Sequence, residues 1–197
     1  MRIIGITGGV GSGKSRVLLY LEKKYGATIC QADHVAWQLQ MPGTVCYRSI
    51  VDWFGEGILN ADATINRTKL GQIVFADAAS LARLNAIMHP AVKKEIRHRI
   101  QREAEQGTEF FVLEAALLIE ENYDEICDEL WYIYSSESVR IQRLRESRAY
   151  SDEKIRDMMS KQLSEAVFRE KCDRVIDNNG MFSVTEEQIQ TILEKYR

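Results

Sequence analysis

Eight consecutive residues near the N-terminus, Gly8 to Ser15, carry the clearest chemical pattern in the sequence. They read GGVGSGKS and match G-x-x-x-x-G-K-[ST] at every required position. Glycines leave consecutive backbone N–H groups unblocked, so the loop can surround phosphate oxygens, and a helix that begins there adds its positive dipole end. We therefore expect a polyphosphate ligand, with Lys14 reaching its β- and γ-phosphates and the Ser15 hydroxyl ligating Mg²⁺.

Other interpretations of these glycines are weaker. A dinucleotide fingerprint, G-x-G-x-x-G, requires glycine where Lys14 stands when it is counted from Gly9, and where Arg16 stands when it is counted from Gly11. The loop therefore does not favour NAD. The structural alternative is a tight glycine turn in which the lysine is merely solvated.

The loop alone does not choose a reaction, because GTPases, mechanical ATPases and small-molecule kinases share it. DWFG at 52–55 spells the D-x-x-G of GTPases, but it lies in a stretch with helical character, and the sequence has no Asn-Lys-x-Asp. An ATPase stays open, since the apolar run FFVLE ends in Glu114, a carboxylate that could polarise Mg²⁺ and water. A kinase is favoured by a helical insertion suited to enclosing a second substrate and by an arginine-rich segment.

That segment, ESVRIQRLRESRAYS at 137–151, carries arginines suited to phosphoryl transfer. Arg140 and Arg143 are three residues apart, so they share a helix face and could point into one cleft. Guanidinium groups supplied by a closing segment stabilise the charge of the moving phosphoryl group while water is excluded. The alternative is a solvated helix face that pairs with Glu137 and Glu146.

The acceptor side of a kinase needs a carboxylate near the γ-phosphate, and Asp33 is the best candidate. It follows the short apolar run ATIC at 27–30, which is predicted to be a strand. Ligands of open α/β sheets bind beyond the carboxyl ends of the strands, where this carboxylate would lie. A helix N-cap is the alternative role for Asp33.

The elements that must position these residues follow an α/β pattern. Separated by helices, apolar runs predict strands at 2–7, at 27–30, from 109, at 129–135 and at 173–180. The first helix begins at Lys14 and ends before Gly26. This alternation indicates a parallel sheet covered on both faces.

Between 42 and 106 the sequence predicts only helical pieces, which together resemble an insertion. They lie at 45–54, at 67–75 and from Ser80 onward. Apolar residues recur every fourth position in the last piece, interrupted by His89-Pro90, where the proline is expected to kink the helix.

Composition restricts the class of protein. The 197 residues carry a net charge of −3 with a pI near 5.7, which argues against a general nucleic-acid binder. No stretch is long and apolar enough to span a bilayer, and the N-terminus lacks a secretory pattern. The four cysteines show no close pairing and are expected to be reduced and mostly buried. We expect a cytoplasmic monomer or weak homo-oligomer, without nucleic-acid or membrane partners.

The ordered motifs GITGGVGSGKS, ADHVA, LNAIMHPAV, EAALLIE, RIQRL and KCDRVIDNNG resemble those of the dephospho-coenzyme A kinase family nearly from end to end. The resemblance implies transfer of the γ-phosphate of ATP to the 3′-hydroxyl of dephospho-coenzyme A, the last step of coenzyme A synthesis. ATP and Mg²⁺ would be required. It also implies an α/β P-loop NTPase fold whose parallel sheet has about five strands in the order 2-3-1-4-5.

The resemblance assigns roles along the chain. A single kinase domain, 1–197, would comprise a nucleotide-binding core at 1–41 and 107–197, a helical acceptor subdomain at 42–106 and a lid at 140–165. It implies catalytic roles for Lys14, Asp33, Arg140 and Arg143; ATP contacts at Gly11, Ser12, Gly13, Lys14, Ser15, Arg16 and Asn178; metal binding by Ser15; and acceptor contacts at Asp33, His89, Pro90 and Leu117. A turn before Gly180 would explain Asn178 almost as well.

Some residues depart from the family pattern. Gln31 stands where the family often has aspartate, Trp37 where arginine is common, and Ser147 where arginine is frequent, although Arg148 next to it could substitute. These changes concern substrate contacts more than the reaction class. Two alternatives stay open: a kinase of the same architecture for another small acceptor, such as a nucleoside monophosphate, and a noncatalytic ATP-binding protein.

Overall fold

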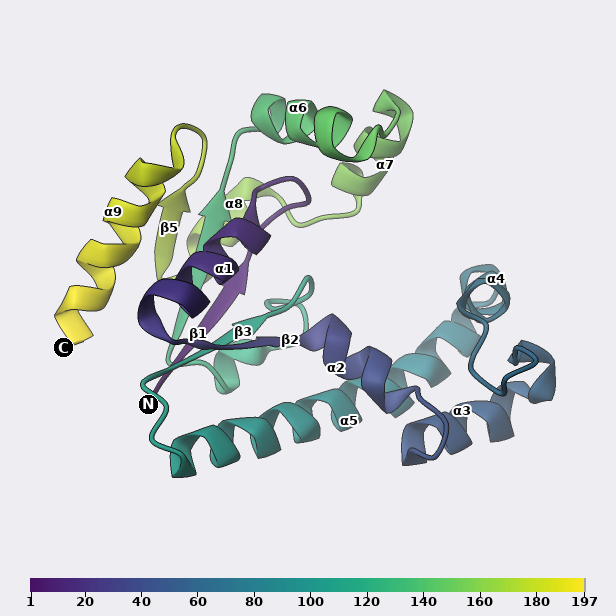
Figure 1. Cartoon of the computed structure of the whole chain (residues 1–197). Coiled ribbons are helices and arrows are strands. Elements are labelled where there is room, and N and C mark those ends of the chain that lie inside the picture. The colour runs from purple at the N-terminus through teal and green to yellow at the C-terminus, as the bar shows by residue number, and fades with distance from the viewer. Residues whose placement is uncertain (197) are drawn as a thin grey trace. The chain divides into compact units, whose positions relative to one another are not determined.

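The computed structural model describes residues 1–196, in which strands and helices alternate (Figure 1). In chain order they are β1 (Arg2–Thr7), α1 (Lys14–Tyr25), β2 (Thr28–Gln31), α2 (Ala32–Leu39), α3 (Val45–Phe54), α4 (Arg67–Ala76), α5 (Ala78–Glu105), β3 (Phe110–Glu114), β4 (Glu129–Tyr134), α6 (Glu137–Arg148), α7 (Asp152–Ser160), α8 (Glu165–Lys171), β5 (Arg174–Asp177) and α9 (Phe182–Leu193). Short 3-10 helices lie at Glu56–Ile58, Tyr123–Glu125 and Glu194–Tyr196.

The strands form one parallel sheet in the order β2-β3-β1-β4-β5. The central strand β1 pairs with β3 on one side, where Ile6 lies opposite Glu114, and with β4 on the other, where Thr7 lies opposite Tyr132. This arrangement confirms the fold class and the strand order that the family resemblance implies. It also brings the ends of β1, β3 and β4 to one edge of the sheet, beside the glycine loop that follows β1.

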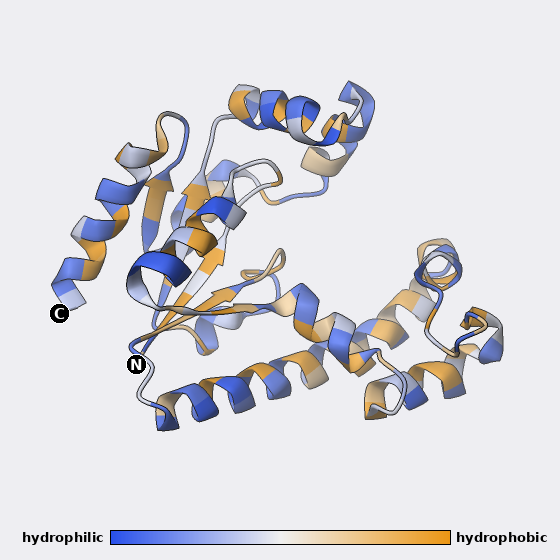
Figure 2. Ribbon diagram, in the orientation of Figure 1, coloured by the Kyte–Doolittle hydropathy of each residue, from blue (hydrophilic) through white to orange (hydrophobic). Residues whose placement is uncertain are grey.

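Helices cover both faces of this sheet (Figure 2). On one face α1 and α9 pack against the strands, and the buried cluster comprises Ile4, Ile6, Val17, Leu18, Leu21, Ala27, Phe110, Val112, Trp131, Ile133, Ile176, Phe182, Ile189 and Leu193. Tyr132 points to the opposite face because it alternates with Trp131 and Ile133. There the ring of Phe168 in α8 stacks on it, with ring centroids 4.7 Å apart. Burial on both faces explains why the strands are continuous apolar runs.

By its contacts the chain divides into two compact units. One consists of Met1–Ile29 with the chain from Glu103 onward and contains the glycine loop, and the other consists of Cys30–Arg102. The functional division that the sequence suggests, with an acceptor subdomain at 42–106 and a lid at 140–165, remains a prediction.

The second unit is helical, as expected, apart from β2 residues at its start and one isolated bridge between Leu59 and Ile65. Its long helix α5 begins two residues before Ser80 and continues through Pro90. The kink expected at His89-Pro90 remains a prediction. Buried residues on both sides of the proline hold the helix together, namely Met88, Val92 and Ile96.

The cysteines behave as the composition suggests. All four are free, and Cys30, Cys46 and Cys172 are buried. Burial raises the pKa of the Cys127 and Cys172 thiols to about 12, which keeps them protonated and unreactive near neutral pH. Within residues 1–196, no helix combines the length and apolar composition that crossing a bilayer demands.

Candidate active site

The glycine loop connects β1 to α1 and uses backbone conformations that favour glycine. Gly11 has a φ of 80° and Gly13 a φ of 90°, both in the left-handed region. A Cβ atom on Gly13 would lie 2.3 Å from the side-chain nitrogen of Asn178. The glycine therefore serves two purposes, because it permits the turn into α1 and lets a neighbouring side chain approach the loop.

Donors from three other segments hold the Ser12 carbonyl in place. It accepts hydrogen bonds from Asn178 Nδ2 at 2.8 Å, Ser135 Oγ at 3.2 Å and Arg143 Nη1 at 3.3 Å. Asn178 is buried, and its Oδ1 in turn accepts from Thr185. The structure thus shows Asn178 supporting the loop, whereas its expected contact with ATP remains a prediction.

Two buried hydroxyls at the loop have no hydrogen-bond partner within residues 1–196. Ser12 Oγ and Thr7 Oγ1 are both in this state, and each residue is 1% exposed. Leaving a buried polar group unsatisfied costs about 1–3 kcal/mol. A polar ligand bound at the loop would remove part of this cost, so the orphaned hydroxyls fit a phosphate-binding site.

Lys14, in the first turn of α1, folds back over the loop. Its Nζ donates to the Gly8 carbonyl at 2.7 Å and lies 3.8 Å from Glu114 Oε1. Glu114 is the last residue of β3, next to β1 in the sheet. The carboxylate considered above for an ATPase is therefore at the loop, where it can bind a metal ion in a kinase as well.

Arg140 and Arg143 share the helix face that their spacing predicts, and that face meets the loop. Arg140 Nε donates to the Val10 carbonyl at 2.8 Å, and Arg143 Nη2 donates to the Asn178 carbonyl at 2.7 Å. Burial lowers the pKa of the Arg140 guanidinium, and in the described chain no carboxylate accepts a hydrogen bond from it. A partly desolvated cation beside a phosphate loop is well prepared to receive an anion.

The alternative of a solvated arginine face does not hold for these two residues. Neither one pairs with Glu137 or Glu146 in residues 1–196, and Glu146 instead accepts from Gln142. The exposed member of the segment is Arg145, which forms a bidentate pair with Asp152.

Sequence reasoning missed Gln162, in the turn between α7 and α8. Its side-chain oxygen accepts from the Val10 N–H at 3.2 Å and from Arg140 Nη2 at 2.6 Å. Gln162 thus links Arg140 of α6 to the glycine loop, although it is 152 residues from Val10 in the sequence. No periodicity or motif in the sequence marks this glutamine.

The other residues expected at the nucleotide are exposed. Ser15 lies in the first turn of α1 with its side chain open to solvent. The guanidinium carbon of Arg16 lies 4.0 Å from the centroid of the Phe182 ring. Their contacts with metal and ATP remain predictions.

Asp33 belongs to the second unit, where it lies in the first turn of α2. The N-cap of this helix is Gln31, so Asp33 does not take the alternative capping role. Its carboxylate is exposed and makes no hydrogen bond or ion pair with another residue of the described chain. A carboxylate without a structural task is available for chemistry.

The remaining acceptor residues stay predictions. His89 and Pro90 lie in the middle of α5, His89 half-buried and Pro90 exposed. Leu117, in the segment after β3, is 50% exposed, so its side chain is accessible to a ligand.

One family profile and three known proteins that are similar to this chain share one description. The profile of a family described as "Dephospho-CoA kinase" matches residues 2–183. A dephospho-CoA kinase of Carboxydothermus hydrogenoformans is 38% identical over 195 residues, which cover 99% of this chain and 94% of that protein. One of Geobacter sulfurreducens is 39% identical, with 99% and 98% of the two chains covered. The solved structure of a dephospho-CoA kinase from Campylobacter jejuni, 22% identical, superposes over the full length of both chains with a TM-score of 0.73.

Proposed function

The chain belongs to the dephospho-CoA kinase family and is a kinase that phosphorylates dephospho-CoA, and on this premise we propose how its residues divide the reaction. The γ-phosphate of ATP passes to the 3′-hydroxyl of the acceptor ribose, giving coenzyme A and ADP. The main support for these residue roles is that Lys14, Arg140 and Arg143 all donate hydrogen bonds to the same glycine loop.

On the donor side, the loop amides and Lys14 hold the β- and γ-phosphates. In this structure the Lys14 ammonium donates to the neutral Gly8 carbonyl. When ATP binds, the ammonium would donate to phosphate oxygens instead, because hydrogen bonds to charged acceptors are stronger. Arg140 and Arg143 neutralise the charge that spreads over the transferring group. Little covalent chemistry is left for the protein, because positioning and electrostatics supply most of the catalysis.

Mg²⁺ is the metal that the oxygen donors at the loop fit. The Ser15 hydroxyl and the Glu114 carboxylate are hard ligands, and Mg²⁺ in such sites takes one or two protein oxygens together with substrate phosphates. The metal would supply charge neutralisation on the phosphates.

On the acceptor side, Asp33 orients the 3′-hydroxyl and accepts its proton as the new P–O bond forms. Support comes from its exposed carboxylate, which no residue of the described chain engages. His89, Pro90 and Leu117 contact the acceptor. We further propose a cytoplasmic enzyme, active as a monomer or weak homo-oligomer, without nucleic-acid or membrane partners.

An acceptor panel tests this function. The enzyme is incubated with ATP and Mg²⁺ together with dephospho-CoA, AMP, CMP or no acceptor, and ADP formation and the phosphorylated product are measured. We expect ADP formation to depend on dephospho-CoA and the product to carry a 3′-phosphate. Transfer only to nucleoside monophosphates would show that the acceptor is a nucleotide and not dephospho-CoA. ATP binding without any transfer would indicate a noncatalytic protein.

Replacing Gln162 with methionine tests its tie to Arg140. Methionine keeps the length of the side chain but cannot accept the two hydrogen bonds, so Arg140 keeps its bond to the Val10 carbonyl and loses the one that fixes its Nη2. Because a hydrogen bond to a charged group is worth about 1.5–3 kcal/mol, we expect kcat to fall about 10-fold or more. Steady-state kinetics with ATP and dephospho-CoA provide the measurement.

The matched control is Gln142→Met, on the exposed part of α6, where the side-chain amide of the glutamine donates to Glu146. It should leave kcat unchanged within about twofold. If Gln162→Met had the same kcat as this control, the contact with Arg140 would have no part in turnover.

A further inference from the structure

The position of the Asp33 carboxylate depends on the helix that carries it. This carboxylate makes no hydrogen bond or ion pair with another residue of the described chain, so no neighbouring side chain fixes its place. A general base must lie within hydrogen-bond reach of the proton that it accepts. Contacts that hold α2 in place therefore bear on turnover, even where they lie far from Asp33 itself.

The sequence of α2 gives this helix little stability of its own. It has eight residues, and its buried side chains are the small Ala32 and Val35. Within the described residues, its N-cap Gln31 makes no side-chain capping bond, and its last turn contains no basic residue to complement the helix dipole. Helices this short are marginal without tertiary contacts, so other elements must hold α2.

Arg99 of α5 supplies contacts on both sides of Asp33 in the sequence. Its Nη2 donates to Gln38 Oε1, in the last turn of α2, at 2.7 Å. Burial raises the pKa of the Cys30 thiol in β2, and the Arg99 guanidinium partly opposes this rise, because it lies within hydrogen-bond reach of the sulfur. Glu95, one turn earlier in α5, accepts from Arg99 Nε at 2.9 Å and so orients the guanidinium. Arg99 thus contacts the strand before Asp33 and the helix after it.

The charge of Arg99 also suits the end of α2. Gln38 is the second-last residue of this helix, so the guanidinium that bonds to it lies beside the helix C-terminus, where the dipole favours a cation. The Arg99 side chain is 26% exposed, so solvent screens its charge only in part. Arg99 therefore provides the cation that the last turn of α2 lacks.

The same face of α5 holds the start of β2, the strand that leads directly into α2 (Figure 1). One turn after Arg99, Glu103 Oε2 accepts hydrogen bonds from the hydroxyls of Thr28 at 2.8 Å and Thr108 at 2.7 Å. Residues four apart in a helix share a face, and so do Thr28 and Cys30, which are two apart in a strand. The strand is thus fixed at both positions before the chain enters α2.

We propose that Arg99 is a positioning residue for Asp33, an inference that rests on the proposed function. Arg99 holds α2 through Gln38 and the preceding strand through Cys30, so the Asp33 carboxylate meets the acceptor hydroxyl at one place. Loss of Arg99 leaves the carboxylate chemically intact but allows α2 to move. A misplacement of about 1 Å can lower a rate about 100-fold, so a smaller displacement of α2 should lower it about 10-fold.

Two variants remove the contact between α5 and α2 from opposite ends. Arg99→Met keeps the apolar stem of the side chain, and Gln38→Leu keeps the arginine with its contact to Cys30. Each should lower kcat with dephospho-CoA about 5- to 10-fold, while calorimetric ATP affinity stays within about twofold of wild type. The controls are Arg97→Met and Gln72→Leu, since both residues are exposed, lie in the same unit and make no hydrogen bond or ion pair in residues 1–196. They should change kcat by less than about twofold.

The double variant of Arg99→Met with Asp33→Asn tests whether Arg99 acts through Asp33. Once the carboxylate is gone its placement no longer matters, so Arg99→Met should change kcat by less than about twofold in the Asp33→Asn background. A residue with a merely structural role would lower kcat equally in both backgrounds. Equal losses in the two backgrounds, or kcat values for Arg99→Met and Gln38→Leu that match the controls, would overturn the proposal.

Hydrogen exchange separates this proposal from the function itself. Backbone amides of residues 30–39 should exchange at least about fivefold faster in Arg99→Met and Gln38→Leu than in the controls, while those of β4 and α9 exchange at the wild-type rate. Equal exchange at 30–39 in variants and controls would overturn the proposal, as would faster exchange throughout the chain, which indicates general destabilisation. If the wild type failed to phosphorylate dephospho-CoA, the proposed function would fall, and exchange would still show whether Arg99 holds α2.

Discussion

Replacing Lys14 with methionine is expected to lower kcat about 100- to 1000-fold, the usual cost of losing one charged or hydrogen-bonding group that stabilises a transition state. Methionine preserves the length of the side chain and removes the ammonium that lies between the Gly8 carbonyl and Glu114. Affinity for ATP should fall as well, because the same ammonium holds the β- and γ-phosphates before transfer. Steady-state kinetics and calorimetric titration with ATP measure the two effects separately.

The control for this substitution is Lys24→Met, in the last turn of the same helix, where the side chain is exposed. It removes an equal charge from α1 and should leave kcat and ATP affinity within twofold of the wild type. Thermal denaturation shows whether Lys14→Met still folds, since that substitution removes the ion pair between Lys14 and Glu114. A folded Lys14→Met enzyme with kcat within threefold of wild type would refute the role of Lys14.

The features predicted correctly from the sequence are those that depend on neighbours in the chain. The glycine loop requires left-handed backbone at Gly11 and Gly13, and only glycine adopts it at low cost, so its local sequence is diagnostic. Gly26 ends α1 in the same conformation, as expected for a helix C-terminus. Strand order has no such local signal, and it was predicted only through the family resemblance.

Pro90 shows that packing can keep a helix continuous through a proline. A proline removes one backbone hydrogen bond and crowds the preceding turn, which kinks or breaks a helix. In α5 the buried side chains of Met88, Val92 and Ile96 lie on both sides of it, and their burial outweighs the loss of a single bond. The apolar spacing of α5 can be read from the sequence, but the residues that pack against this helix and keep it continuous cannot.

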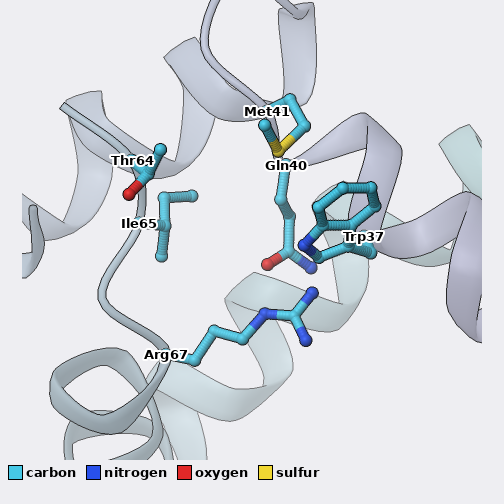
Figure 3. Close-up of a pocket in the computed structure, with 6 residues that line it drawn as sticks. All are labelled: Trp37, Gln40, Met41, Thr64, Ile65 and Arg67. Carbon is cyan, nitrogen blue, oxygen red and sulfur yellow. The ribbon is translucent and has the colours of Figure 1, made fainter. Parts of the chain in front are cut away.

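The parts of the site that could not be predicted are long-range contacts. Gln162 reaches Val10 and Arg140 through the folding of α6 and α7, and glutamine in a polar segment has no distinguishing pattern. A pocket in the helical unit is lined by Trp37 of α2 and Arg67 of α4, which are 30 residues apart in the sequence (Figure 3). Such contacts depend on loop geometry, which periodicity does not encode.

Asp33→Asn is expected to lower kcat about 100-fold or more, while the affinity for ATP stays unchanged. Asparagine keeps the size and a hydrogen-bond acceptor but cannot take the proton of the 3′-hydroxyl, and general-base assistance contributes about 10²- to 10⁴-fold. Stability should not change, because the carboxylate makes no hydrogen bond or ion pair in residues 1–196 and does not cap α2. The measurements are kcat with dephospho-CoA, calorimetric ATP binding and the thermal midpoint.

Asp52→Asn is the matched control, since Asp52 is an exposed aspartate in α3 of the same unit, and its carboxylate also makes no hydrogen bond or ion pair in the described chain. It removes one negative charge and should leave kcat within twofold. If Asp33→Asn matched this control, the proton would have to leave through another group, and Glu114 would be the next carboxylate to replace. A large loss of ATP affinity in Asp33→Asn would instead mean that Asp33 acts on the donor side, because an acceptor-side base affects turnover without holding the nucleotide.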